Sequence, residues 1–250
     1  MQKQELAEGM ILYTFEPDPG RHFGYNIIAL IDEKRALLID TGYERHAIQV
    51  LQDLQNQGVV IEEVVLSHFH NDHMFGLKVL PDVSVTGSSR YRTTLDLWTP
   101  PEEQGQFIPK TLVEGTAEIN FGKHHLLLSV FPGHSECTML IQINQEYLHI
   151  ADEIMFSNDG EPLLPSVDFR SSVARHRESL EKLQAYSYLT MIPAHGRVFQ
   201  GKETIEREIT NRLVYLQAIE SSTRQLTYEE ATAQCDCEFL HPEWFKNAYR

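Results

Sequence analysis

The segment at residues 67–73 carries the strongest chemical signal in this sequence. It reads Ser-His-Phe-His-Asn-Asp-His, which places three imidazoles and one carboxylate close together. Neutral histidine and ionised aspartate are the nitrogen and oxygen donors that borderline-soft divalent metals prefer. The segment therefore predicts a metal site. Its candidate ligands are His68, His70, Asp72 and His73.

The spacing within this segment suits a pair of metal ions. His68 and His70 are two residues apart at the end of an expected strand, so their side chains leave on the same face and can hold one ion. Asp72 and His73 are adjacent where a helix is expected to begin, and they can face a second position close by. Two ions about 3.5–4 Å apart can share a hydroxide.

Further donors stand at the ends of three later strands. His134 follows an expected strand in a Gly-containing turn, Asp152 ends another, and His195 follows a third beside Gly196. Functional residues on loops at strand ends are the expected layout for a site built on an α/β scaffold. We therefore expect these three residues to supply the remaining ligands.

The expected secondary structure follows from the spacing of apolar residues. Residues 44–57 have the pattern of an amphipathic helix that ends at Gly58. Strands are expected at residues 10–15, 25–32, 36–40, 63–66, 83–86, 125–131, 138–143, 147–151 and 189–192, and helices at 44–57, 72–80, 171–186, 202–222 and 227–234. Residues 88–111 and 157–170 are expected to be irregular, and such long connections often form lids or binding loops.

Composition limits the class of protein. At 250 residues and 42% hydrophobic content, the chain can bury a large core. No stretch approaches the roughly 20 apolar residues of a membrane span, and no apolar signal-peptide core follows residues 1–5. We therefore expect a cytoplasmic protein without membrane contact. Its three cysteines are expected to be reduced thiols, with Cys137 retained as a neighbour of a ligand.

The net charge of −15 bears on the partners. A chain this acidic repels nucleic acid unless it has a local basic patch. A small-molecule substrate is therefore expected, nucleic acid is not, and a homo-oligomer is left open.

Other polar and aromatic residues are given no site role. A lone histidine is usually structural or superficial, and this is expected of His22, His46, His124, His125, His149, His176 and His241. Asp168 and Arg170 are expected to be solvated residues of the second loop. Trp98 could line a pocket, although packing in a core or loop is the simpler expectation.

These motifs together resemble the metallo-β-lactamase superfamily. Residues 68–73 fit its HxHxDH signature, and Gly133-His134, Asp152 and His195-Gly196 follow in the order and approximate spacing of that family. Residues 38–42 also resemble the turn ahead of its metal-binding segment. The resemblance extends over about residues 10–200. It implies an α+β fold, a four-layer αββα sandwich of two mixed β-sheets with helices on the outer faces.

The resemblance also assigns roles to residues. It implies one domain over residues 1–250, with a core at about 10–200 and C-terminal helices at 201–250 packed on it. One metal would be held by His68, His70 and His134, and the other by Asp72, His73 and His195, with Asp152 bridging both. Asp40 would orient a ligand, although Asp-Thr-Gly could also be a simple turn. The cofactors implied are two divalent ions, zinc first, with iron or manganese as alternatives.

The function expected is that of a metal-dependent hydrolase. A dinuclear site with a bridging hydroxide would cleave an ester, thioester, lactone or phosphodiester bond, and Asp72 would be the catalytic residue that orients the nucleophile. Residues 133–137 lack the second glycine of the GHTxG form found in glyoxalase II and many lactonases, so the substrate stays open. The alternatives are a mononuclear iron persulfide dioxygenase, an endoribonuclease, and a non-catalytic metal-containing sensor or binding module.

Overall fold

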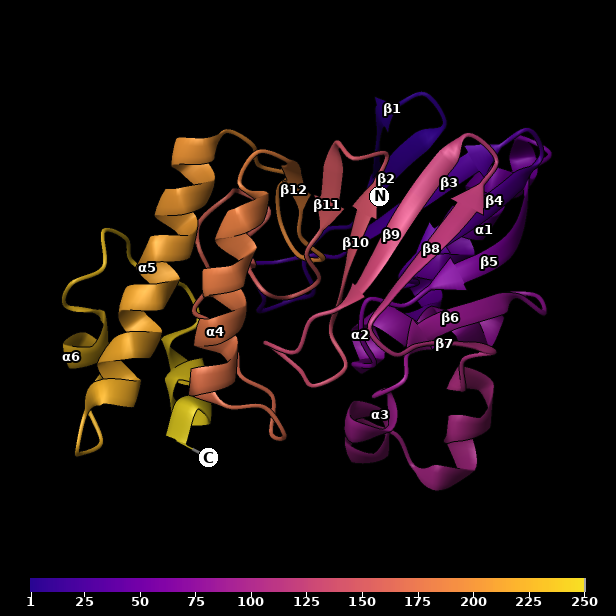
Figure 1. Ribbon diagram of the computed structural model, residues 1–250. Coiled ribbons are helices and arrows are strands. Elements are labelled where there is room, and N and C mark those ends of the chain that lie inside the picture. The colour runs from indigo at the N-terminus through magenta and orange to yellow at the C-terminus, as the bar shows by residue number, and fades with distance from the viewer. Residues whose placement is uncertain (250) are drawn as a thin grey trace.

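Two β-sheets lie face to face in the computed structural model, which describes residues 1–249, and helices cover the outer face of each sheet (Figure 1). The layers run helix, sheet, sheet, helix. This order buries both faces of each sheet, which strands with apolar residues on both faces require. The predicted α+β class and αββα sandwich are confirmed.

Within residues 1–249, the first sheet has seven strands in the order β1-β2-β3-β4-β5-β6-β7. They are β1 (Gln2–Ala7), β2 (Met10–Thr14), β3 (Asn26–Asp32), β4 (Arg35–Ile39), β5 (Val60–Val65), β6 (Ser84–Ser88) and β7 (Thr111–Val113). Neighbours are antiparallel from β1 to β4 and parallel from β4 to β7. The apolar run of β4 is buried on both faces, as is typical of a central strand next to a parallel neighbour.

The second sheet has the order β12-β11-β10-β9-β8. Its strands are β8 (Thr116–Phe121), β9 (His124–Val130), β10 (Met139–Ile143), β11 (Tyr147–His149) and β12 (Thr190–Ile192). Pairing is antiparallel except between β11 and β12. A parallel pair needs a crossover, and α4 (Val173–Leu183) supplies it.

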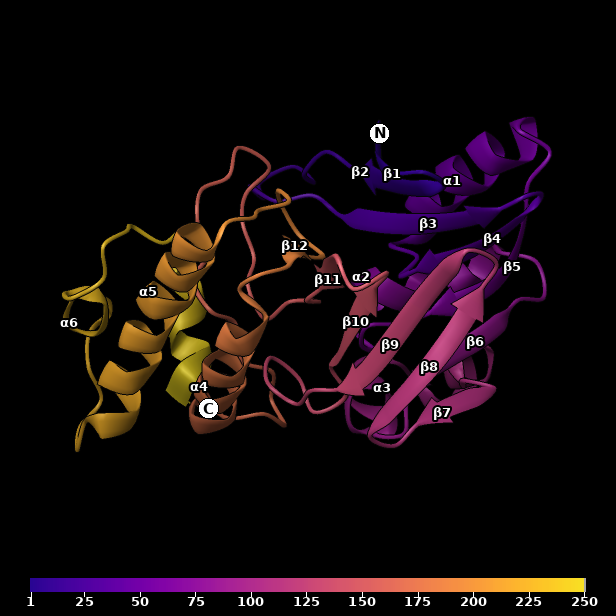
Figure 2. The ribbon, with the colours of Figure 1, turned by 45° about the horizontal axis from the view of Figure 1, so that its top comes forward.

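Helices enclose the two sheets. The first sheet carries α1 (Glu44–Asn56), α2 (Asn71–Met74), η1 (Phe75–Val79), α3 (Arg92–Trp98) and η2 (Pro101–Phe107), where η marks a 3₁₀ helix. Beyond the second sheet lie α4, η3 (Gln184–Tyr186), α5 (Lys202–Ser221), α6 (Tyr228–Thr232) and η4 (Pro242–Tyr249). Figure 2 shows α1 and the pair α4–α5 on opposite sides of the sandwich. Within residues 1–249, no helix combines the length and the apolar character needed to cross a membrane.

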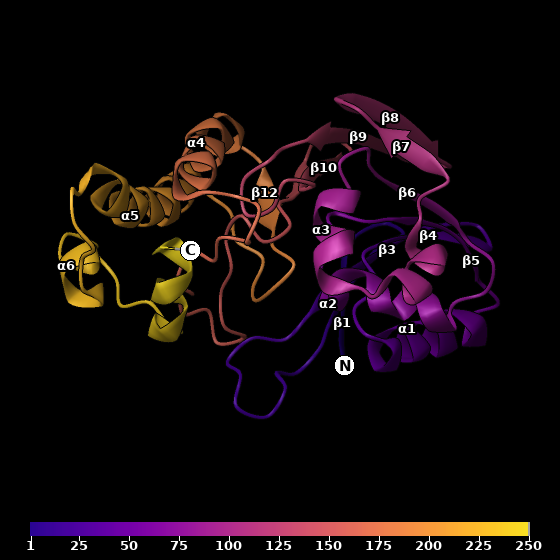
Figure 3. The same cartoon turned by 90° about the horizontal axis from the view of Figure 1, so that it is seen from below.

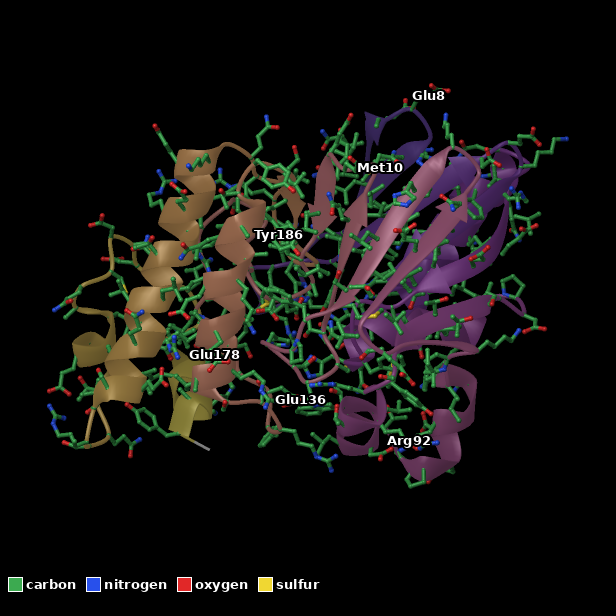
Figure 4. All side chains as sticks on the ribbon, in the orientation of Figure 1. Glu8, Met10, Arg92, Glu136, Glu178 and Tyr186 are labelled. Atoms are coloured by element: carbon green, nitrogen blue, oxygen red, sulfur yellow. The ribbon has the colours of Figure 1, made fainter. Side chains whose placement is uncertain are left out.

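Apolar side chains fill the space between the sheets. Leu30 and Ile39 of the first sheet and Leu126 and Ile141 of the second are fully buried in this layer. Each such side chain contributes about 1.5–3 kcal/mol through burial. Side chains also fill the space between the second sheet and α4 (Figure 4). This packing holds the strand ends in fixed relative positions.

Residues 88–111 differ from expectation, because they contain α3 and η2 as well as the start of β7. Leu95 and Phe107 are fully buried against the first sheet and anchor these short helices. The anchoring is a tertiary effect that the prolines and polar residues of the segment do not reveal. The edge strands β1 and β8 were also not expected. β1 is polar and exposed over its first four residues, whereas β8 alternates exposed polar residues with Ala117, Ile119 and Phe121, a pattern that was not used to predict a strand.

The helix expected at residues 72–80 is divided in two. α2 has His70 rather than Asp72 as its N-cap residue, and η1 follows it from Phe75. A Cβ at Gly76 would come within 2.5 Å of the Thr41 carbonyl oxygen, so glycine is needed for this close approach.

The ends of several strands meet at one edge of the sandwich. Asp40 follows β4, residues 67–73 follow β5, His134 lies between β9 and β10, Asp152 follows β11 and His195 follows β12. Seen from below, η4 and α3 lie on either side of the loops at this edge (Figure 3). The fold therefore brings residues far apart in sequence to one place.

Candidate metal centre

The structure brings all seven predicted ligands together in two adjoining groups. The first group is His68, His70, His134 and Asp152, and the second is Asp72, His73 and His195. Within each group, one potential ligand atom per residue lies within 4.8 Å of every other. The division follows the one that the resemblance implies, except that Asp152, expected to bridge both ions, falls in the first group.

Three imidazole nitrogens converge in the first group. The Nδ1 atom of His70 lies 3.0 Å from Nε2 of His68 and 3.2 Å from Nε2 of His134. His68 and His134 are almost fully buried, so water cannot easily fill the space between them. Close lone pairs of neutral imidazoles repel each other, and a shared cation would relieve that repulsion.

Asp152 lies between the two groups. Its Oδ2 atom is 3.6 Å from Nε2 of both His134 and His73, and its Oδ1 atom is 3.4 Å from Nε2 of His195. Ala151, immediately before it, has a φ of 48°, a left-handed conformation that is uncommon for alanine. The backbone there is held in a costly shape that aims Asp152 at the centre.

Asp72 is the most solvent-exposed residue of the second group. Its carboxylate oxygens lie 3.7 Å from Nε2 of His73 and 3.6 Å from Nε2 of His195. The Asp72 side chain is 18% exposed, against 6% for Asp152. Asp72 is therefore the carboxylate of the centre most open to a bound molecule.

Three of the histidines have a hydrogen-bond partner for the ring nitrogen that faces away from the centre. His73 donates to Asp40 at 2.9 Å, His134 to the Ser166 carbonyl at 2.7 Å, and His195 to the Gly24 carbonyl at 2.7 Å. Because these acceptors carry no proton, they fix the tautomer of each neutral ring, in which the inward nitrogen is unprotonated. An unprotonated inward nitrogen is what a metal ion requires.

Charge at the centre is distributed unevenly. Burial opposes ionisation of Asp152, but the surrounding histidines, His195 and His73 first, hold its pKa well below its usual range. Burial also opposes a charge on His73, yet Asp152, Asp72 and Asp40 raise its pKa well above the usual value. Burial instead lowers the pKa of His68. The carboxylates therefore stabilise positive charge at this place.

The residues fit a pair of divalent ions. Within residues 1–249, Nε2 of His73 and Oδ1 of Asp152 are buried without a hydrogen-bond partner, and both point into the centre. Buried polar atoms without partners are costly, and a bound cation would satisfy both. Nitrogen and oxygen donors together suit zinc, iron or manganese.

Asp168 corrects the expectation of a solvated loop residue. It is 6% exposed, and its Oδ2 atom lies 3.5 Å from Nε2 of His70. A backbone hydrogen bond from Asp168 to the His134 carbonyl, at 3.0 Å, holds the loop against the centre. Asp168 thus faces the outer nitrogen of His70, as Asp40 faces that of His73. A loop aspartate of this kind carries no local signal in the sequence.

Glu153 is a second residue that the sequence did not single out. It is 1% exposed, accepts the backbone N–H of His134 at 2.8 Å, and accepts the hydroxyl of Ser179. Burial raises the pKa of Glu153 to about 8. A Cβ at Gly133 would lie within 2.4 Å of the Glu153 carboxylate, so glycine is required for this turn. Glu153 therefore fixes the backbone that presents His134.

The remaining histidines lie outside the two groups. His149 and His176 are fully buried, His46 packs between Phe15 and Tyr25, and His125 is exposed at its side chain. Cys137 is buried and contacts Thr94 at 3.2 Å.

Two cavities open above the metal centre, and we call them the two lobes of one cleft. They share four lining residues, His70, Trp98, His134 and Ser166. The Val173 lobe, of about 360 Å³, extends from them toward Val167, Asp168, Val173, Ala174, Asn247 and Ala248. The Arg21 lobe, of about 390 Å³, extends toward Arg21, Phe23, Tyr43, Asp72, His195 and Trp244. Each volume is in the range of small-molecule sites. Trp98, expected to pack in a core or loop, is a wall of both lobes.

Comparison with known proteins identifies the family. The family model described as the metallo-beta-lactamase superfamily matches residues 20–195, which is more than half of the chain. The chain therefore belongs to the metallo-β-lactamase superfamily. A metallo-beta-lactamase from Pontibacter korlensis has the same fold, with a TM-score of 0.70 at 17% identity over 86% of this chain and 98% of that one.

Two curated relatives carry names that describe hydrolases. The "Probable metallo-hydrolase YqgX" of Bacillus subtilis is 26% identical over 194 residues, or 70% of this chain and 83% of that protein. The "Atrochrysone carboxyl ACP thioesterase AacuM" of Aspergillus aculeatus is 28% identical over 182 residues, or 70% of this chain and 51% of that protein. This chain thus matches only about half the length of the fungal relative. The predicted class, a metallo-hydrolase of this superfamily, is confirmed.

Proposed function

We propose that the protein uses two divalent ions, zinc in the first instance, to hydrolyse a small-molecule ester or thioester. The observation that carries the proposal is the meeting of two complete ligand groups at Asp152, on the floor of a cleft open to small molecules. Lactone and phosphodiester bonds remain within the same chemistry. The thioester is placed first because the Aspergillus relative is named a thioesterase.

The ligand sets follow from the two groups. His68, His70 and His134 would hold one ion, and Asp72, His73 and His195 the other, with Asp152 shared between them. When bound, such a pair of ions supplies Lewis acidity toward a substrate oxygen and hydroxide at neutral pH. Asp40, Ser166 and Gly24 hold the outer nitrogens of three of these histidines and so keep the ligands in place.

Asp72 is proposed as the residue that orients the nucleophile. Its carboxylate lines the Arg21 lobe and is more exposed than that of Asp152. It can accept a hydrogen bond from the attacking water and pass a proton to the leaving group. Trp98 and Trp244 line the cleft on either side and can exclude bulk water from a bound substrate.

The ligand geometry supports this proposal over the alternatives. A mononuclear iron dioxygenase needs one group, whereas here Asp72, His73 and His195 also converge. A sensor whose site is a relic would have no need of partners for the outer nitrogens, yet Asp40 and Asp168 are both buried beside the ligands. An endoribonuclease needs cations for the phosphate backbone, and among the described residues that line the two cavities only Arg21 is a lysine or arginine.

The test is hydrolysis of a panel of scissile bonds by zinc-loaded protein. We expect turnover of a thioester or ester that disappears with a chelator and returns with zinc. His70→Ala should remove at least about 99% of it, since a lost ligand disrupts the centre. His125→Ala is the matched control, because His125 is exposed on β9 and belongs to neither ligand group. Full activity in His70→Ala, or no turnover of any bond, would contradict the proposal.

A further inference from the structure

The two lobes of the cleft border different parts of the metal centre. The Val173 lobe reaches His70 and His134 of the first ligand group. The Arg21 lobe also reaches Asp72 and His195 of the second group. A substrate whose scissile bond lies over the centre must therefore extend one end into each lobe. The chemistry of each lobe then selects the chemistry of that end.

Arg21 places one positive charge in a lobe that the carboxylates of Asp72 and Asp152 also line. It is the one cation among the described residues that line either lobe. Its guanidinium lies over the Phe23 ring, 5.3 Å from the centroid, and pairs with no carboxylate within residues 1–249. The nearby Asp18 carboxylate is already held by Arg45 at 2.5 Å and by the Tyr25 hydroxyl at 3.1 Å. The charge of Arg21 is therefore available to a ligand.

Two other arginines near the cleft are not available in this way. Arg90 pairs with Glu136 at 3.3 Å, and Arg175 pairs with the same carboxylate. Neither residue lines a lobe. Arg21, by contrast, lines a lobe and has no ion pair within residues 1–249.

The loop that carries Arg21 is tied to the metal centre. The Arg21 N–H donates to the Asp18 carbonyl at 2.9 Å, which closes a turn. Further along, the Gly24 carbonyl accepts from His195 at 2.7 Å, and the Gly24 N–H donates to Asn158 at 2.7 Å. The loop is therefore anchored to a ligand on one side and to residue 158 on the other. These contacts hold the backbone beside Arg21 in place relative to His195 of the metal centre.

The Val173 lobe has no lysine or arginine among the described residues that line it. Val167, Val173 and Ala174 give it an apolar wall, while the buried carboxylate of Asp168 lies at its inner end. The Oδ2 atom of Asp168 lies 3.5 Å from Nε2 of His70, so a carboxylate stands where this lobe meets the metal centre. An anionic group would be repelled there. The lobe accepts a compact, uncharged group.

The charge of the metal centre affects whether an anionic group is attracted to the cleft, and Arg21 is the residue that would attract one. The carboxylates of Asp40, Asp72, Asp152 and Asp168 all lie at the centre. Their negative charge offsets the positive charge of two divalent ions, so the loaded centre would add little long-range attraction for an anion. The whole chain carries a net charge of −15. Arg21 is the local exception to this acidic surface.

We propose that the substrate is a thioester or ester with a compact, uncharged acyl group in the Val173 lobe and an anionic leaving group paired with Arg21. The inference rests on the proposed hydrolase function. In the reaction, the acyl carbon forms a bond to a water oxygen and its bond to sulfur or oxygen breaks. One proton of the water goes to the leaving group, and no oxidant or reductant is needed.

The experiment compares three butyryl thioesters that differ in the charge of the thiol. They are S-butyryl-3-mercaptopropionate, its neutral analogue S-butyryl-3-mercaptopropionamide, and the cationic butyrylthiocholine. Zinc-loaded wild type, Arg21→Ala and Arg21→Glu are assayed for thiol release. Arg92→Ala is the matched control, because it removes the same charge from an exposed helix residue that lines neither lobe.

Wild type should prefer the carboxylate over the amide by about fivefold in kcat/KM, the size expected for one partly solvated ion pair. Arg21→Ala should abolish this preference while the amide changes by less than about twofold, and Arg21→Glu should favour the thiocholine ester. Turnover with no charge preference, or a preference that survives Arg21→Ala, would overturn this inference and leave the hydrolase proposal standing. Hydrolysis of none of the three, nor of any bond in the wider panel, would overturn both.

Discussion

Asp40 accepts a hydrogen bond from Nδ1 of His73 at 2.9 Å, and the same carboxylate accepts both the N–H and the hydroxyl of Ser67 at 2.7 Å. Asp40 has a φ of 58°, in the left-handed region that glycine alone adopts freely. One strained residue at the end of β4 thus fixes the histidine segment after β5. It also sets the tautomer in which His73 turns a bare nitrogen toward the centre.

Asp40→Asn should weaken metal binding without unfolding the protein. The amide keeps the size of the carboxylate, but one of its two acceptor positions becomes a donor that faces N–H and O–H groups. Replacing a residue that hydrogen-bonds to a metal ligand typically lowers the affinity for the metal by about 10–100-fold. Zinc affinity measured by chelator competition should therefore fall by about that factor. Asp159→Asn, in an exposed position of the loop at 157–170, is the control. Wild-type affinity in Asp40→Asn would show that Asp40 is merely part of a turn.

Asp168→Asn should have a smaller effect of the same kind. The contact between Asp168 and His70 is 3.5 Å long, against 2.9 Å for the contact between Asp40 and His73. We expect zinc affinity to fall by up to about tenfold in the same competition assay. A loss larger than that of Asp40→Asn would mean that Asp168 holds the ion directly.

Trp98→Ala should impair substrate binding more than stability. Trp98 lines both lobes, is 40% exposed, and its ring lies 5.7 Å from that of His70. Loss of this wall should raise KM about three- to tenfold. Leu97→Ala is the control, because Leu97 is 39% exposed, adjacent in sequence, and lines neither lobe. Equal changes in KM for the two variants would argue against a binding role for Trp98.

Protonation of His46 should lower the free energy of unfolding in weak acid. Burial, with a contribution from Arg45, lowers the pKa of His46 to about 4, and its Nδ1 accepts the backbone N–H of Tyr43 at 3.2 Å. In the unfolded chain the pKa returns to about 6.5. The folded-state pKa is therefore depressed, and the stabilisation is present above pH 6.5 and is lost as the pH falls toward 4.

The measurement compares chemical unfolding of wild type and His46→Asn at pH 7 and pH 5. Asparagine keeps an acceptor near the position of Nδ1 but does not titrate. Wild type should lose about 2 kcal/mol more than the variant over this interval. Because both proteins carry the same metal ligands, any loss of metal in acid cancels in the comparison. Equal losses would place the pKa of folded His46 near its unfolded value.

The fold and the ligand residues could be predicted because their signals are local. The histidine segment at residues 67–73 carries four ligand-type residues in one stretch, and His134, Asp152 and His195 each follow or end an apolar run. Apolar runs and amphipathic spacing also located most strands and helices. The edge strand β1 and the helix α3 escaped prediction, because pairing with β2 and burial of Leu95 hold them in place.

The outer contacts of the site could not be predicted in the same way. Asp168, Glu153 and Arg21 belong to no motif that marks a functional site in the local sequence. Their roles depend on tertiary packing, such as the hydrogen bond from Asp168 to the His134 carbonyl. Trp244 reaches the cleft from the C-terminal 3₁₀ helix, more than a hundred residues from His134 in sequence. Nothing local in the sequence reports a contact of this range.

Metal content tests the central claim most directly. Freshly isolated protein should hold two divalent ions per chain by elemental analysis, as the two ligand groups at Asp152 require. His73→Ala should lower the content to about one, since it leaves the first group intact, and His125→Ala should leave it at two. One iron per chain with consumption of oxygen, or less than one equivalent of any metal, would contradict the account.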